Sequence, residues 1–233
     1  MGFSRTEIAK LTDEKLNNKY KPSLSDAIGY IDFISQRNKS KISFSLRLQY
    51  DNRLSFQAFS INLKNLESLF SSLLPNELQK FYGNIISLNK INFYKTEFDF
   101  NLVEIENHNH LNEYLEEVVK CIEFHEKEIF PKLLDIDFLA EYVGSVPFER
   151  KAEVAVGGSF PVHLFKKMAI LKWGNQNERY LEYKRGTEIL IDKYAIKKPD
   201  KYMPEFKKGF DQLVNHLENE PNPFDNVTFA NNV

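Results

Sequence analysis

The residues with the clearest potential for chemistry are two pairs of candidate metal ligands. His108 and His110 are two positions apart, so their side chains point the same way only in an extended segment. Cys121 and His125 are four positions apart, so they share one face of a helix. A thiolate combined with imidazoles suits zinc. If the two pairs converge, the chain would be a metal-assisted hydrolase that uses these four residues.

A metal site needs three or four convergent ligands, and nothing in the sequence forces the two pairs together. In the alternative interpretation Asn107 or Asn109 caps a helix, the adjacent histidines are solvated, and Cys121 is a small apolar core residue. The sequence also lacks the motifs of serine hydrolases, zinc proteases, thiol oxidoreductases, P-loop proteins and dinucleotide-binding proteins. We therefore assign no catalytic residue and expect no cofactor.

Charge is distributed unevenly along the chain, although the net charge is only −2. The segment from Glu97 to Glu149 contains fourteen acidic residues and three lysines. Within it, four glutamates accompany the apolar stripe of a predicted helix: Glu113, Glu116, Glu117 and Glu123. Such a row is most often a solvated helix face, but it can also attract a basic partner. We take these four glutamates as a candidate protein-binding face.

The segment 163–208 has the opposite charge, with twelve Lys/Arg and six Asp/Glu. Its lysines alternate with tyrosines, which could suit single-stranded nucleic acid. The tyrosines have the spacing of core residues, so packing explains them first. Just before this segment, Gly157-Gly158-Ser159 precedes a predicted helix that contains Lys166 and Lys167. A helix start of this kind can bind an anion, but it is more often a tight connection.

The elements that position these residues begin with a β-hairpin between Ile42 and Ile61. Apolar and polar residues alternate from Ile42 to Tyr50, and the alternation resumes at Leu54. A three-residue turn at 51–53 keeps the apolar side chains on one face, with Leu48 opposite Phe56.

Helical patterns dominate the rest of the chain. We expect helices at 5–18, at 63–73, at 76–82, from about 111 to 122, up to Gly144, and from Pro161 to Trp173. Two further stripes lie at 180–194 and 206–217. We expect strands at 98–105 and at 154–156. The segment 24–36 has a helical spacing, but Ile31-Asp32-Phe33 also alternates, so a strand is the alternative there.

These patterns predict an α+β fold, in which an antiparallel β-meander is covered by helices and the C-terminal third is helical. We expect one domain over residues 1–218, with a subdivision near 145–160 as an alternative, and an irregular tail at 219–233. No apolar run approaches the roughly 20 residues that span a membrane, so we expect no membrane association. The N-terminus lacks the apolar stretch of a secretory signal, and a single cysteine fits a reducing compartment, so we expect a cytoplasmic protein.

The order of elements resembles that of uncharacterised bacterial α+β domains, including accessory proteins that act as immunity factors for toxins. The similarity rests on the hairpin, on Leu102-Val103-Glu104-Ile105 leading into the 111–122 helix, and on Met168-Ala169-Ile170-Leu171 with Gly174 and Tyr180. It covers about half of the chain. The resemblance implies a bacterial, non-enzymatic protein that binds another protein, and it implies no catalytic residues.

The sequence therefore favours a protein-binding factor whose acidic face covers a basic partner. The metal-assisted hydrolase and the binder of single-stranded nucleic acid are the alternatives.

Overall fold

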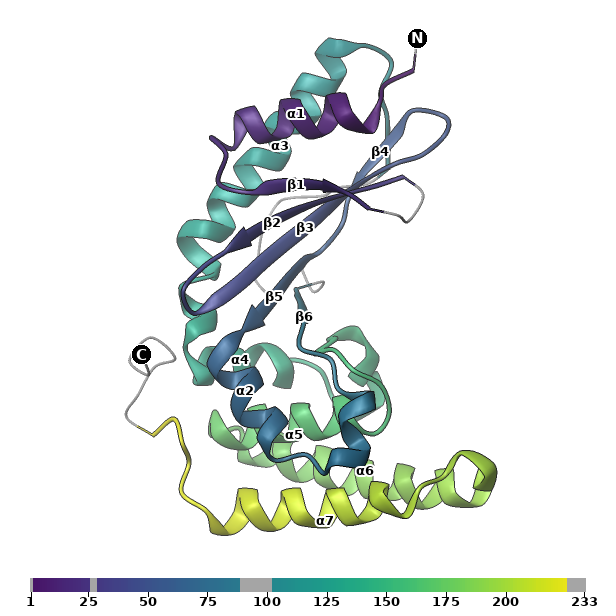
Figure 1. Ribbon diagram of the computed structural model, residues 1–233. Helices are drawn as coiled ribbons and strands as arrows, with labels where there is room; N and C mark the ends of the chain where they lie inside the picture. Colours follow the sequence, from purple (N-terminus) through teal and green to yellow (C-terminus); the bar gives the residue numbers. More distant parts are fainter. Residues whose placement is uncertain (1, 26–28, 89–101, 226–233) are drawn as a thin grey trace. The chain divides into compact units, whose positions relative to one another are not determined.

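The computed structural model describes residues 2–25, 29–88 and 102–225. The chain divides into two compact units, and each is considered by itself (Figure 1). The first unit comprises residues 1–61 and 88–131, and the second comprises residues 62–87 and 132–233. The segment 145–160, where we placed an alternative subdivision, lies inside the second unit.

The chain has an α+β fold, and its described residues form a seven-stranded sheet in which neighbouring strands of the main path are antiparallel. The strands are β1 (Lys21–Leu24), β2 (Tyr30–Gln36), β3 (Ser40–Leu48), β4 (Arg53–Phe56), β5 (Phe59–Leu63), β6 (Ile86–Leu88) and β7 (Val103–Glu104). Their order is β1-β2-β3-β4-β7, and β5 pairs with both β3 and β6. This arrangement confirms the predicted antiparallel meander.

The helix that we expected at 24–36 is wrong and the strand alternative is correct, because β1 ends at residue 24 and β2 occupies residues 30–36. The strand β2 pairs antiparallel with β3 along its whole length, with Phe33 opposite Phe44. Alternate residues of β2 are buried, including Ile31 and Phe33. Pairing with β3 therefore overrides the weak helical spacing. Gly29 has φ +87°, which favours glycine and places the residue just before the strand.

The hairpin has the predicted three-residue loop, but the loop lies one residue earlier. Gln49 N donates a hydrogen bond to the Arg53 carbonyl at 2.8 Å, so the loop is Tyr50-Asp51-Asn52. Leu48 therefore lies opposite Leu54 rather than Phe56. Asn52 has φ +57°, and a left-handed residue at the end of the turn suits a three-residue hairpin loop. Tyr50 is 93% exposed, not part of the apolar face.

The alternation also changes phase within the second strand of the hairpin. β4 ends at Phe56, and the buried residues of β5 are Phe59, Ile61 and Leu63. The run that we read as one strand is therefore two strands, offset by one residue at 57–58. Gln57 N still bonds to the Ser45 carbonyl at 2.8 Å, so the chain remains against β3 through this break.

Two helices accompany the sheet in the first unit: α1 (Arg5–Lys15) and α3 (His108–Phe124), the latter continued by a π turn at His125–Ile129. The helix α1 contacts α3, β1 and β2 (Figure 1). Its N-cap is Ser4, whose side chain accepts a hydrogen bond from Glu7 N, as the predicted capping spacing requires. Phe44 lies at the centre of the core, with ring centroids of Phe33, Phe56 and Phe59 within 5.9 Å.

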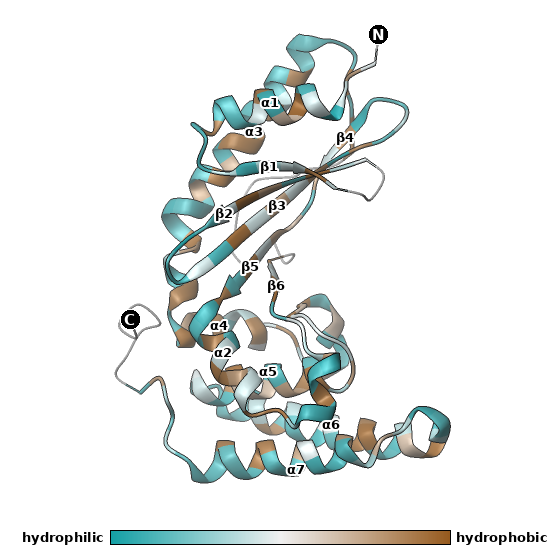
Figure 2. Ribbon diagram, in the orientation of Figure 1, coloured by the Kyte–Doolittle hydropathy of each residue, from teal (hydrophilic) through white to brown (hydrophobic). Residues whose placement is uncertain are grey.

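The second unit is mainly helical, which confirms the helical C-terminal third. Its helices are α2 (Lys64–Ser72), α4 (Ile136–Gly144), α5 (Val162–Trp173), α6 (Asn177–Lys197) and α7 (Pro204–Asn219). Short helical turns lie at Asn76–Phe81, Lys132–Leu134, Phe148–Glu153 and Pro199–Lys201. Hydrophobic and hydrophilic residues alternate along α7, as its amphipathic pattern predicts (Figure 2).

Three local predictions change here. Residues 154–156 form no strand: Val154 and Val156 are buried, and Ala155 contributes one carbonyl to a hydrogen bond from Ser87 N. The predicted strand at 98–105 is seen only as β7, and 98–101 lie outside the described residues. The tail is not wholly without contacts, because Phe224 is buried against Trp173. No helix in the described ranges is long and apolar enough to cross a membrane.

Candidate functional site

The four candidate glutamates share the solvent side of α3, and we call them the acidic face: Glu113, Glu116, Glu117 and Glu123. The helix begins at Asn107, whose side chain accepts hydrogen bonds from the amides of residues 109 and 110. The opposite side carries the apolar stripe Leu111, Leu115, Val118 and Ile122, all of it buried. Burial of this stripe places all four carboxylates in solvent.

Ion pairs neutralise only part of the acidic face. Glu116 lies 3.4 Å from the amino group of Lys15, and Glu117 lies 2.6 Å from that of Lys120. Among the described residues, Glu113 and Glu123 form no ion pair. They are separated by ten residues, or about 15 Å along the helix axis. Within the part of the chain that the structure describes, the face therefore has an unpaired exposed negative charge at each of its two ends.

The four candidate metal ligands do not come together. His108 and His110 are exposed in the first turn of α3, where they contact Glu7 at 3.0 Å and Glu106 at 3.8 Å. Cys121 and His125 are buried at the other end of the same helix. Thirteen residues of helix separate His108 from Cys121, which is about 20 Å. Within the described ranges no group of three or more His, Cys, Asp or Glu residues could hold a metal.

Cys121 and His125 belong to the apolar core of the first unit. The His125 ring lies 4.5 Å from the ring of Phe59 and 5.8 Å from that of Phe130. Its Nδ1 donates a hydrogen bond to the Cys121 carbonyl at 2.8 Å, and burial lowers the pKa of His125. Burial also raises the pKa of the Cys121 thiol to about 12. A neutral imidazole and a protonated thiol fit the core interpretation of this pair.

The tyrosines of the basic segment all pack against other residues of the second unit, but they are not equally buried. Tyr180 and Tyr183 are buried, and the rings of Tyr194 and Tyr202 pack against Phe206. The bases of a nucleic-acid strand stack on exposed rings, so Tyr180 and Tyr183 are not available for stacking, whereas Tyr194 and Tyr202 are half-buried against Phe206. Several lysines of the segment also form local ion pairs, such as Lys184 with Glu218 at 2.6 Å.

The Gly157-Gly158 pair makes a close backbone contact. Both residues have positive φ, and a Cβ on Gly157 would lie 2.4 Å from the Ile85 carbonyl. A Cβ on Gly83 would lie 2.2 Å from Gly158 N. Ser159 N is also bonded to the Phe81 carbonyl. The glycines therefore allow two loops of the second unit to meet, which is the tight-connection interpretation.

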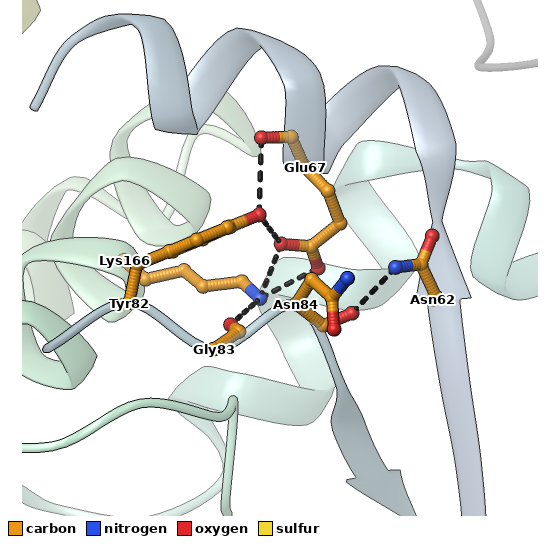
Figure 3. A network of polar contacts seen from close by, with 6 residues as sticks. All are labelled: Asn62, Glu67, Tyr82, Gly83, Asn84 and Lys166. Carbon is orange, nitrogen blue, oxygen red and sulfur yellow. Dashed lines mark hydrogen bonds and ion pairs between the residues drawn. The ribbon is translucent and has the colours of Figure 1, made fainter. Parts of the chain in front are cut away.

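Sequence reasoning missed a buried ion pair in the same unit, between Glu67 of α2 and Lys166 of α5 (Figure 3). The two side chains are 6% and 1% exposed. Lys166 Nζ donates to both carboxylate oxygens, at 2.5 and 2.7 Å, and to the Gly83 carbonyl at 3.2 Å. The hydroxyl of Tyr82 donates to Glu67 Oε2 at 2.6 Å. All three ammonium hydrogens therefore have acceptors.

Burial raises the pKa of Glu67 and lowers that of Lys166, and the attraction between the two charges opposes both shifts. Burial also raises the pKa of Tyr82, so this hydroxyl remains a donor. A satisfied and enclosed pair of this kind joins two helices and leaves no open position for a substrate. The signal for it lies in the sequence, because Glu67 and Lys166 occupy positions that are surrounded by apolar residues at helical spacing.

Lys167 is a second buried lysine, and it is not paired in the same way. It is 1% exposed, and its amino group donates to the Lys151 carbonyl. Among the described residues no carboxylate forms an ion pair with it. Burial, with a smaller contribution from Lys151, lowers the pKa of Lys167 to about 8. Burial and the two neighbouring lysines also lower the pKa of His163 one turn earlier.

No protein-family model, curated protein or solved structure matches this chain. The resemblance to immunity-like bacterial domains therefore stays a prediction, and residue roles rest on the contacts described above.

Proposed function

We propose that this chain is a non-enzymatic binding protein whose acidic face engages a basic surface of another protein. The observation that carries the proposal is the exposure of all four carboxylates along α3, with Glu113 and Glu123 unpaired among the described residues. Exposed like charges raise the rate at which an oppositely charged partner associates. A partner with lysines or arginines spaced over about 15 Å would match the two ends of the face.

The finer form of the proposal is an immunity or accessory factor of a bacterial cytoplasm. It follows from the resemblance of the hairpin and of the segments around α3 and α5, and from the absence of a catalytic motif in the sequence. An immunity factor acts by covering its target, so it needs a complementary surface and no reacting groups. The buried apolar stripe of α3 suits this role, because a helix face that is held by packing loses little entropy on binding.

Photo-crosslinking from the acidic face tests the proposal and identifies the partner in the same step. A photo-reactive amino acid replaces Asn112, which is exposed beside Glu113 and Glu116. Cells that produce the protein are irradiated, and the crosslinked partner is identified by mass spectrometry. We expect one dominant partner with a basic surface.

The same experiment is repeated with the four glutamates of the acidic face changed to Gln. A control variant carries four Glu→Gln changes at exposed positions of the second unit: Glu141, Glu149, Glu178 and Glu220. Both variants change the net charge by the same amount. The crosslink should disappear only in the acidic-face variant. Equal crosslinking in both variants, or no crosslink in the wild type, would contradict the proposed face.

A further inference from the structure

A feature that the acidic face leaves unexplained is a pocket of about 800 Å³ at the hairpin end of the first unit. A volume of this size is typical of sites for small organic molecules. The turn between β3 and β4 and the residues at the start of α1 both contribute to its wall. We call it the arginine pocket, and its charged lining residues are Arg5, Arg47, Arg53 and Asp51.

The lining has an excess of positive charge. Arg53 is bound to Asp51 at 2.6 Å, so these two residues neutralise each other. Arg5 and Arg47 form no ion pair with a carboxylate among the described residues. The four charged residues that line the pocket therefore carry a net charge of about +2.

Both unpaired arginines are held in place by other contacts. A terminal nitrogen of Arg5 donates to the Ser25 carbonyl at 3.0 Å. The guanidinium of Arg47 lies 5.3 Å from the centre of the Tyr30 ring. A guanidinium has five N–H donors, so each arginine retains donors for a ligand. Because both side chains are already held by these contacts, ordering them around a ligand costs less conformational entropy than it would for a freely moving surface arginine.

The backbone around the pocket is also constrained. Leu48 N donates to the Gly29 carbonyl at 2.8 Å, and a Cβ on Gly29 would lie 2.3 Å from the Leu48 carbonyl. The close approach therefore requires glycine. Asn52 holds the left-handed end of the turn. These contacts fix the wall that carries Arg47.

We propose that the arginine pocket binds a small molecule that carries a phosphate monoester. The charge of such a group at neutral pH is about −2 and matches the unpaired charge of Arg5 and Arg47. Planar guanidinium groups donate paired hydrogen bonds to phosphate oxygens. The exposed ring of Tyr50 lines the pocket and is available to cover the organic part of the ligand, beside Phe3, whose ring packs against His108. This site is separate from the acidic face and does not depend on the proposed protein partner.

Calorimetric titration at about 0.15 M salt tests the pocket with three probes: adenosine 5′-monophosphate, inorganic phosphate and succinate. The monophosphate should bind most tightly, inorganic phosphate more weakly, and succinate least. The variant Arg47→Gln should lower the affinity for the monophosphate about tenfold or more, because it removes hydrogen bonds to a charged group. Arg47→Lys keeps the charge but loses the paired geometry, so its affinity should be intermediate.

Arg185→Gln is the matched control, since Arg185 is an exposed arginine of the second unit. It should bind the monophosphate as the wild type does. Tyr50→Ala should lower the affinity for the monophosphate but leave the affinity for inorganic phosphate unchanged. If Arg47→Gln and Arg185→Gln lowered the affinity for the monophosphate equally, net charge alone would explain the effect, and the proposal would be overturned. Succinate binding as tightly as the monophosphate, or no saturable binding of any probe up to about 10 mM, would also overturn it.

Discussion

At the scale of single residues, the buried pair of Glu67 and Lys166 gives a prediction about the stability of the second unit. Lys166→Met removes one charge and leaves a buried carboxylate without its partner. We expect a loss of about 3 to 5 kcal/mol in the free energy of unfolding, measured by denaturant titration. The double variant Glu67→Leu/Lys166→Leu removes both charges and should recover most of this loss. A loss below about 1 kcal/mol for Lys166→Met would contradict the proposed role of the pair.

Lys167 gives a prediction that depends on pH. Its pKa in the folded protein, about 8, lies below the ordinary value of 10.5. The folded state therefore loses this proton first, and the charged form opposes folding below pH 8. This penalty, about 3 kcal/mol for a shift of this size, fades as the pH rises from 8 toward 10.5.

The variant Lys167→Met should therefore stabilise the protein at pH 7, and its advantage over the wild type should shrink by pH 10. Denaturant titrations of both proteins at several pH values measure the difference. Lys151 and His163 are the charged and titratable neighbours of Lys167, and both remain in the variant. A stability difference that does not change between pH 7 and pH 10 would rule out this explanation.

At the scale of elements, the N-cap of α3 positions the acidic face. Asn107→Ala removes the side chain that accepts from two amides of the first turn. We expect a loss of about 1 kcal/mol in thermal or chemical unfolding. Asn112→Ala is the control, since Asn112 is exposed in the helix interior, and its effect should stay within about 0.5 kcal/mol. Equal effects of the two substitutions would mean that Asn107 does not act as a cap.

The helices and the hairpin were predictable from sequence because their signals are periodic and local. Pro161 at the start of α5 and Gly174 at its end, for example, frame a helix of the expected length. The residues of the hairpin that share a face were also predictable, because shifting the pairing of the two strands by one residue would move apolar side chains out of the buried face. The position of its turn was not, because moving the loop by one residue leaves every side chain on the same face.

Other features depend on contacts between distant parts of the chain. The strand β2 forms where β3 provides a partner, although its own pattern is ambiguous. Glu67 and Lys166 are 99 residues apart, so their pairing has no local signal beyond two charges in apolar surroundings. The arginine pocket likewise combines the start of α1 with a turn more than 40 residues later. Of the candidate sites, only the exposure of the acidic face followed from helical periodicity.

At the scale of the whole molecule, the structure shows how the acidic and basic segments of the sequence contribute to the surface charge. The basic segment 163–208 is partly neutralised within its own unit, for example by Lys207 with Glu188 at 2.6 Å. Two of its lysines, Lys166 and Lys167, are buried. On the acidic face, two of the four carboxylates have partners among the described residues, and the other two, Glu113 and Glu123, are exposed. The first unit therefore presents negative charge on α3, while exposed cations of the second unit such as Lys193 and Lys197 form no ion pair among the described residues.

The central claim is that these carboxylates recognise a basic protein. The most direct measurement is the affinity of the purified partner for the wild type, for the acidic-face variant and for the control variant, by calorimetry at two salt concentrations. We predict that neutralising Glu113, Glu116, Glu117 and Glu123 weakens binding about tenfold and reduces its dependence on salt, whereas the control stays within about twofold of the wild type. Unchanged affinity and salt dependence in the acidic-face variant would contradict the claim.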